Sequence, residues 1–116
     1  MSESLFTVNV RPGAHDGPAD TTVVDVTGEI DATNATEFQR AVRDIPARPL
    51  VVDLSALQYS DSAGFGVLDE LLARDAVVIV LAPHAPMRAA ARLLDLPCHD
   101  SVATAVAHVR RGERAR

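Results

Sequence analysis

The sequence predicts a single α/β domain in which a mixed central β-sheet of about four to five strands is flanked by about four helices. Two β-branched segments come first, and after residue 30 helical periodicity alternates with short apolar runs, as in strands joined by helices. The chain has 116 residues, of which 47% are hydrophobic, and this length suits one core. Because only 3% of the residues are aromatic, we expect Val, Leu, Ile and Ala to fill it.

The first two strands are expected to pair in an antiparallel manner. Residues 5–10 alternate between apolar and polar side chains, which is typical of a half-buried strand. Residues 12–20 contain several Gly and Pro residues and predict a polar loop. Residues 21–27 are rich in Val and Thr and predict the second strand, which Gly28 is expected to stop.

A first helix is expected to follow. Its apolar stripe has helical spacing and consists of Phe38, Ala41, Val42 and Ile45. Asn34 and Glu37 have the spacing of a capping box, and Thr33 is an alternative cap, so the sequence determines the first residue of the helix only to within one turn. Pro46 and Pro49 should end the helix.

Residues 50–54 form an apolar run that predicts a central strand buried on both faces. A turn should follow, and Asp61-Ser62 should open a second helix, which is expected to be short because the next strand begins at residue 76. This helix carries Phe65, Leu68 and Leu72 on its core side. Val67 and Leu71 lie partly off that side. Their position is equally consistent with two roles, as additional core residues or as part of a partner-facing patch.

The last part of the chain predicts a strand over residues 76–81 and two further helices. Pro86 suits the first turn of the third helix, which should run to about Leu94 before the break at Pro97. A short strand can follow, and Asp100 or Ser101 should cap the fourth helix. Its apolar positions are Val102, Ala105, Val106 and Val109.

Composition excludes several classes of function. The net charge of −5 argues against nucleic-acid binding, and no apolar run approaches the roughly 20 residues that a spanning helix needs. All eleven basic residues are Arg, which excludes Walker-type, Schiff-base and kinase sites, since each needs a lysine. Cys98 is alone, so we expect a small buried residue and neither a disulfide nor a thiolate zinc site. With no signal-peptide pattern, a cytoplasmic protein is expected.

Ser62 is the main candidate for chemistry. Its position at a helix start is typical of an N-cap, but Asp61 could cap the helix itself and leave the serine hydroxyl free. Gly64 and Gly66 are unusual inside a helix and could let another backbone approach that hydroxyl. A phosphate on Ser62 would sit at a helix N-terminus, near Asp61 and Asp31.

Catalytic interpretations of the same region are weaker. Asp31, Asp53 and Asp61 could form an acidic cluster, but a receiver-type site would need a lysine, and Asp53 is expected to cap the turn at Ser55. A hydrolase elbow would need a glycine two residues before Ser62, which is absent. The histidines are expected in loops or on a polar helix face; they are His15, His84, His99 and His108.

Four segments resemble the STAS domain family, in particular the small bacterial anti-sigma factor antagonists (anti-anti-sigma factors). They are Gly28–Ala32, Ala35–Phe38, Val51–Ser55 and Asp61–Leu68. The resemblance implies a STAS-like sheet flanked by helices and a phosphoprotein that regulates transcription by partner switching. It implies that Ser62 is phosphorylated by an anti-sigma factor with GHKL-type serine kinase activity, that phosphorylation releases this partner, and that a phosphatase resets Ser62.

The resemblance also implies which residues dock the partner or kinase. They are Asp31, Asp61, Ala63, Gly64, Phe65, Gly66 and Val67. We expect a STAS domain over residues 1–110, a short basic tail over 111–116, no cofactor, no metal and no enzymatic activity. Two rival functions stay open: a STAS subunit of another signalling or transport assembly without phosphorylation, and a small Asp-dependent hydrolase or phosphatase.

Overall fold

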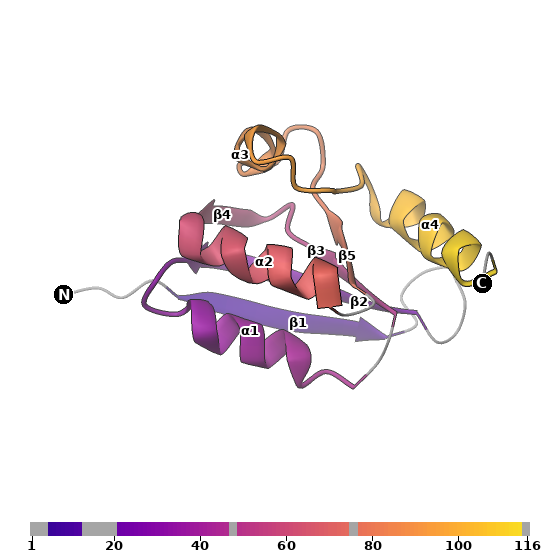
Figure 1. Ribbon diagram of the computed structural model, residues 1–116, viewed down its shortest axis with the longest axis horizontal. Helices are drawn as coiled ribbons and strands as arrows, with labels where there is room; N and C mark the ends of the chain where they lie inside the picture. The colour runs from indigo at the N-terminus through magenta and orange to yellow at the C-terminus, as the bar shows by residue number, and fades with distance from the viewer. Residues whose placement is uncertain (1–4, 13–20, 47–48, 75–76, 115–116) are drawn as a thin grey trace.

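A mixed five-stranded sheet forms the centre of the computed structural model, which describes residues 5–12, 21–46, 49–74 and 77–114 (Figure 1). The strands are β1 (Phe6–Pro12), β2 (Thr22–Ile30), β3 (Leu50–Asp53), β4 (Leu57–Ser60) and β5 (Val77–Val80). The helices in these ranges are α1 (Ala35–Arg43), α2 (Ser62–Arg74), α3 (Arg88–Leu93) and α4 (Val102–Arg114). The predicted α/β class and mixed sheet are confirmed.

The sheet has the order β1-β2-β3-β5, with β4 pairing to β2 beyond the end of β3. β1 and β2 are antiparallel, as predicted, and every other strand pair is parallel. The long strand β2 therefore pairs with two short strands in succession. Its first part, Thr22–Asp25, pairs with β3, and its last part, Gly28–Ile30, pairs with β4.

Two sequence-based expectations about the strands are wrong. Gly28 does not stop the second strand, because it takes a φ of +96° at a bulge and β2 continues to Ile30. A side chain could not replace it, since a Cβ would lie 2.2 Å from the Leu5 carbonyl oxygen. The turn expected after β3 contains the strand β4, whereas the short strand expected after α3 is a single bridge between Val80 and His99.

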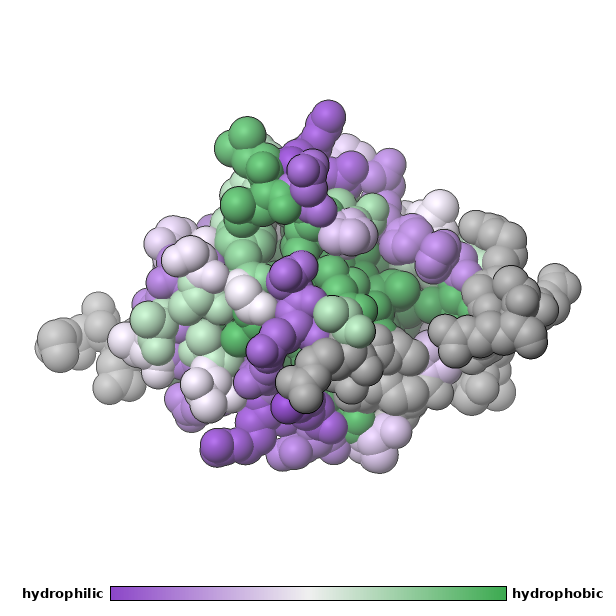
Figure 2. All heavy atoms as spheres, viewed as in Figure 1, coloured by the Kyte–Doolittle hydropathy of each residue, from purple (hydrophilic) through white to green (hydrophobic). Residues whose placement is uncertain are grey.

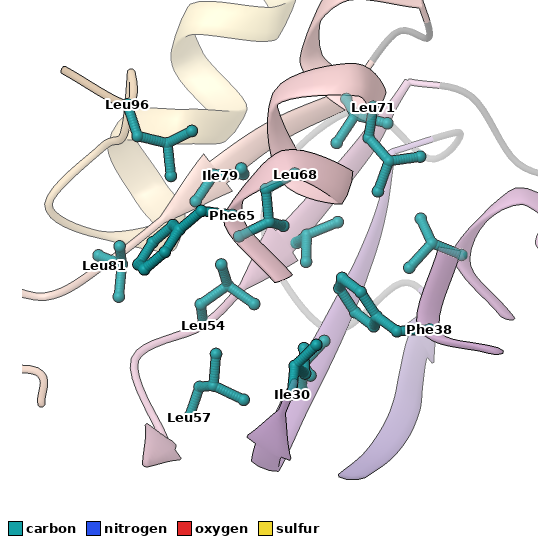
Figure 3. Packing of buried hydrophobic residues seen from close by; sticks show 14 of the residues in the cluster. Ile30, Phe38, Leu54, Leu57, Phe65, Leu68, Leu71, Ile79, Leu81 and Leu96 are labelled. Atoms are coloured by element: carbon teal, nitrogen blue, oxygen red, sulfur yellow. The ribbon is translucent and has the colours of Figure 1, made fainter. Parts of the chain in front are cut away.

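Helices cover the two faces of the sheet unequally. The larger core lies under α1 and α2, where β-strand residues meet Phe38, Phe65, Leu68 and Leu71 (Figure 3). The opposite face carries a smaller cluster in which α4 packs on β3 and β5. Its buried members are Val23, Val51, Val80, Ala105, Val106 and Val109. Val51 and Val52 belong to different clusters, which confirms that β3 is buried on both faces.

The helices agree with the expected apolar stripes, with local corrections. α2 has 13 residues and is not short, and Leu71 is fully buried, so its side chain belongs to the core. Pro86 precedes the first helical residue of α3, Arg88, by two positions. Ser101 caps α4, since its Oγ accepts a hydrogen bond from the Thr104 N–H at 3.1 Å.

The C-terminal region and Cys98 differ in detail from expectation. α4 continues to Arg114, past residue 110 where the tail was expected, and residues 115–116 lie outside the described part of the chain. Cys98 is half-buried against the larger core and not fully buried. Most of the predicted loop over residues 12–20 also lies outside the described residues. Within the described ranges, no helix is long and apolar enough to cross a membrane.

Candidate functional site at the start of α2

The candidate site forms where β2 and β4 end side by side. Ile30 and Ser60, the last residues of these strands, are register partners, so the chain leaves both strands at the same edge of the sheet. The Asp61 N–H donates to the Ile30 carbonyl oxygen at 3.2 Å. Asp31 therefore begins the loop after β2 beside Asp61, the single residue that joins β4 to α2.

Asp61 caps α2. Its Oδ1 accepts hydrogen bonds from the backbone N–H groups of Ala63 at 2.9 Å and Gly64 at 3.2 Å, which otherwise have no helical acceptor. Its Oδ2 accepts from the Ala32 N–H at 3.2 Å and so holds the neighbouring loop. One carboxylate thus satisfies donors from both segments of the site.

This arrangement leaves Ser62 out of the capping interactions. Ser62 is exposed, and its hydroxyl makes no hydrogen bond to any residue that the structure describes. Of the two interpretations of this serine, the cap is excluded, because Asp61 fills that role. The hydroxyl lies free in the first turn of a 13-residue helix, where backbone dipoles favour negative charge.

Hydrogen bonds fix the loop that carries Asp31. Asp31 Oδ1 accepts from the Thr33 N–H at 2.9 Å, and the Asp31 N–H donates to Asn34 Oδ1 at 2.9 Å. The buried Asn34 also donates from Nδ2 to the Glu29 carbonyl oxygen at 3.0 Å. The sequence pointed to Asn34 only as a helix cap; its side chain instead organises the turn before α1, although it stands at the N-cap position.

The three aspartates do not form one cluster. Asp53 lies on the opposite face of the sheet, where its Oδ1 accepts from the Ser55 N–H at 2.9 Å, as predicted, and its Oδ2 is 3.9 Å from Arg11 Nη2. In the described part of the chain, no group of three or more His, Cys, Asp or Glu side chains could hold a metal ion.

The histidines do not complete a hydrolase site with Ser62. The ring of His99, before α4, contacts the ring of His108 in α4, with centroids 4.8 Å apart. His84 is exposed in the turn before α3, and His15 lies outside the described residues. No hydrogen bond joins Ser62 to a histidine within the described ranges.

The residues expected to dock a partner divide into outward and inward positions. Gly66 is exposed, with open space where a Cβ would lie, and Ala63 and Val67 are partly buried. Gly64 and Phe65 are buried. A Cβ on Gly64 would lie 2.1 Å from Ser60 Oγ, so this glycine lets α2 approach the ends of the strands closely. Ser60 is a further residue of this region that sequence reasoning missed.

A pocket beside Ser62 was also not anticipated. It has a volume of about 270 Å³ and lies between the first half of α2 and the chain that leaves α3. Its lining consists of Ser62, Phe65, Gly66, Asp69, Leu94 and Leu96. Consecutive leucines at the end of a short helix were the available signal, because adjacent side chains on a helix point in different directions.

A family model described as "Mlab, STAS domain" matches residues 14–97, which is most of the chain. The chain belongs to the STAS domain family. This STAS domain is similar to an anti-sigma factor antagonist from Mycobacterium paratuberculosis, with a TM-score of 0.68, 26% sequence identity, and coverage of 91% of this chain and 95% of that chain.

Two further solved structures share the STAS fold at lower sequence identity. One is a sulfate transporter family protein from Wolinella succinogenes, with a TM-score of 0.59, 12% identity, and coverage of 83% of this chain and 89% of that chain. The other is the anti-sigma factor antagonist SpoIIAA in its unphosphorylated form, with a TM-score of 0.50, 18% identity, and coverage of 93% and 99%. Anti-sigma factor antagonists are thus among the structural neighbours of this STAS domain.

Proposed function

We propose that this STAS domain is a cytoplasmic, non-enzymatic anti-sigma factor antagonist that is switched by phosphorylation of Ser62. In its unphosphorylated form it binds an anti-sigma factor with serine kinase activity and so frees a sigma factor for transcription. Phosphorylation of Ser62 by this partner releases it, and a phosphatase resets the hydroxyl. The observation that carries the proposal is the exposed Ser62 hydroxyl, which Asp61 relieves of the capping role.

Electrostatics supports a change of surface over a change of fold. A phosphoserine carries about −1.5 to −2 charges near neutral pH. The dipole of α2 favours that charge, while the carboxylates of Asp61 and Asp31, held by backbone donors, oppose it nearby. A partner surface matched to the neutral hydroxyl would therefore meet a concentrated negative charge while the domain stays folded.

The first experiment tests the acceptor. The protein is incubated with a purified anti-sigma factor kinase from the same genome and ATP, and the modified residue is located by mass spectrometry. We expect one phosphate on Ser62 and none in Ser62→Ala. Thr36→Ala, which removes an exposed hydroxyl on α1, serves as the matched control and should be labelled like the unmodified protein. Label that persists in Ser62→Ala would remove Ser62 from the proposal.

The second experiment tests the switch. Ser62→Asp and the phosphorylated protein should bind the anti-sigma factor more weakly than the unmodified protein, with unchanged circular dichroism. Equal affinities, together with no labelling of Ser62, would favour a STAS subunit of another assembly. The hydrolase alternative predicts turnover that is lost in Asp61→Asn, and a screen of ester and phosphate substrates without signal would remove it.

A further inference from the structure

Two large apolar side chains at the end of α3 are exposed. Leu93 is 86% exposed and Leu94 is 58% exposed, whereas the leucines of α2 and β3 are largely buried. Figure 2 shows the hydrophobic side chains protruding over α3 at the top of the view. A contiguous apolar patch of this kind on a small domain is typical of an interaction surface.

The backbone holds this patch in place at a conformational cost. Asp95 has a φ of 55°, a left-handed conformation that glycine adopts most readily. The Leu96 N–H donates to the Ala91 carbonyl oxygen at 2.9 Å, and the Asp95 N–H donates to the Arg92 carbonyl oxygen at 3.1 Å, which is the Schellman pattern. The reversal at Asp95 brings Leu94 and Leu96 to the same pocket while Leu93 projects outward.

The pocket joins this patch to the candidate site. Ser62 and Gly66 of α2 form one wall, and Leu94 and Leu96 form the other. A protein that reaches the Ser62 hydroxyl must therefore come close to the exposed leucines. The buried floor includes Phe65, which is packed in the larger core near Leu96 and Leu81 (Figure 3).

Asp69 supplies the charge of the pocket. It is the one charged residue in the described lining, it is exposed, and its carboxylate makes no ion pair with any residue that the structure describes. An unpaired carboxylate beside an apolar pocket complements a segment that presents an aliphatic side chain together with an Arg or Lys. It disfavours an anionic lipid surface, whose headgroups carry the same sign of charge.

We propose that Leu93, Leu94 and Asp69 form an anchor for the anti-sigma factor kinase, next to the hydroxyl that it modifies. The anchor takes an amphipathic segment of that kinase, with an aliphatic side chain in the pocket and a basic side chain on Asp69. This inference rests on the proposed function and adds the second contact region and the chemistry of its occupant.

The test compares binding and phosphorylation in matched variants. The double variant Leu93→Ser/Leu94→Ser is compared with Val10→Ser, which removes a 43% exposed valine near the C-terminal end of β1. Asp69→Arg is compared with Asp44→Arg, which reverses an exposed carboxylate at the end of α1. Dissociation constants for the purified kinase that labels Ser62 are measured by calorimetry, and urea titrations check that each variant is folded.

We expect the double leucine variant and Asp69→Arg to bind at least about 10-fold more weakly, as for residues central to an interface. Phosphorylation of Ser62 at low protein concentration should slow by a similar factor, while both controls behave like the unmodified protein. If the kinase labels Ser62 but all four variants bind equally, the anchor is wrong and the proposed function stands. If no kinase binds or labels the chain, both are wrong.

Two other occupants are tested with the same variants. A second copy of this chain predicts a dimer in sedimentation equilibrium that the double leucine variant dissociates. A lipid surface predicts cosedimentation with vesicles of phosphatidylcholine and phosphatidylglycerol that the same variant abolishes. Either result would overturn the kinase as the occupant. A monomer that does not cosediment with vesicles and binds the kinase through these leucines supports the kinase as the occupant.

Discussion

The Asp61 carboxylate accepts a hydrogen bond from the Ala32 N–H at 3.2 Å while its other oxygen caps α2. Ala32 and Asp61, which are 29 positions apart in the chain, are thereby held together at one edge of the sheet. The loop after β2 and the first turn of α2 form one unit because a single side chain satisfies both. Ser62, the next residue, is positioned by this unit without contributing to it.

Substitutions at Asp61 and Ser62 should therefore differ sharply in stability. Asp61→Ala removes the acceptor for N–H groups in the first turn of α2 and should lower the free energy of unfolding by about 1–2 kcal/mol. Ser62→Ala removes an exposed, unbonded hydroxyl and should change it by less than about 0.5 kcal/mol. Urea titrations of both variants measure the difference. A larger loss in Ser62→Ala than in Asp61→Ala would contradict the assignment of the cap.

The two glycines of α2 should respond in opposite directions to alanine. Gly64→Ala places a Cβ 2.1 Å from Ser60 Oγ and 3.0 Å from Ile30 Cγ2, so it should destabilise the domain. Overpacking of this kind typically costs about 1–3 kcal/mol. Gly66→Ala enters open space and should stabilise the helix by up to about 1 kcal/mol.

Thermal and urea unfolding of both glycine variants measure these effects, and the double variant Ser60→Ala/Gly64→Ala is the control. Because Ser60→Ala removes the oxygen that the new methyl group meets, it should restore part of the stability lost in Gly64→Ala. Equal losses in the single and double variants would show that the contact with Ser60 is not the cause.

Asp95→Gly should stabilise the protein. The φ of 55° at this position costs an L-residue roughly 1 kcal/mol relative to glycine, although aspartate tolerates it better than most. We expect an increase in the free energy of unfolding of about 0.5–1 kcal/mol, measured by urea titration. Asp95→Ala keeps the strain and loses the polar side chain, and a stability equal to that of Asp95→Gly would rule out relief of backbone strain.

Asn34→Ala should destabilise the loop that carries Asp31. It leaves the Asp31 N–H and the Glu29 carbonyl oxygen without their side-chain partner in a partly buried place. A polar group left unsatisfied when fully buried costs about 1–3 kcal/mol, so the loss should lie toward the lower end of that range. Hydrogen exchange should show faster exchange of the Asp31 amide. Thr36→Ala, on the exposed side of α1, is the control and should leave that amide protected.

Elements with a strong period could be predicted from the sequence. The stripe that contains Phe38 and Val42 predicted α1, and the run 50–54 predicted a strand buried on both faces. β4 was not predictable in the same way. Only its end residues, Leu57 and Ser60, are buried, so neither the alternation of a half-buried strand nor an apolar run identifies it.

The candidate site was predictable in its position and less so in its details. The sequence predicts Asp31 and Asp61 near Ser62 and offers Asp61 as an alternative cap, and the structure has both carboxylates in hydrogen bonds at this place. The expectation that Gly28 stops the second strand was wrong because its left-handed φ lets β2 continue through a bulge. The exposure of Leu93 and Leu94 depends on the chain reversal at Asp95, and no periodic pattern encodes that reversal.

The smaller cluster under α4 lies far from the site along the molecule. In Figure 1 the start of α2 and the helix α4 stand at opposite ends of the view, whereas β1 begins beside the loop that carries Asp31, since the Glu29 N–H donates to the Leu5 carbonyl oxygen at 2.8 Å. A reporter or affinity tag fused after α4 therefore leaves Ser62 open to a large enzyme. The same tag fused ahead of β1 would lie near Ser62 and hinder the access of that enzyme to the serine.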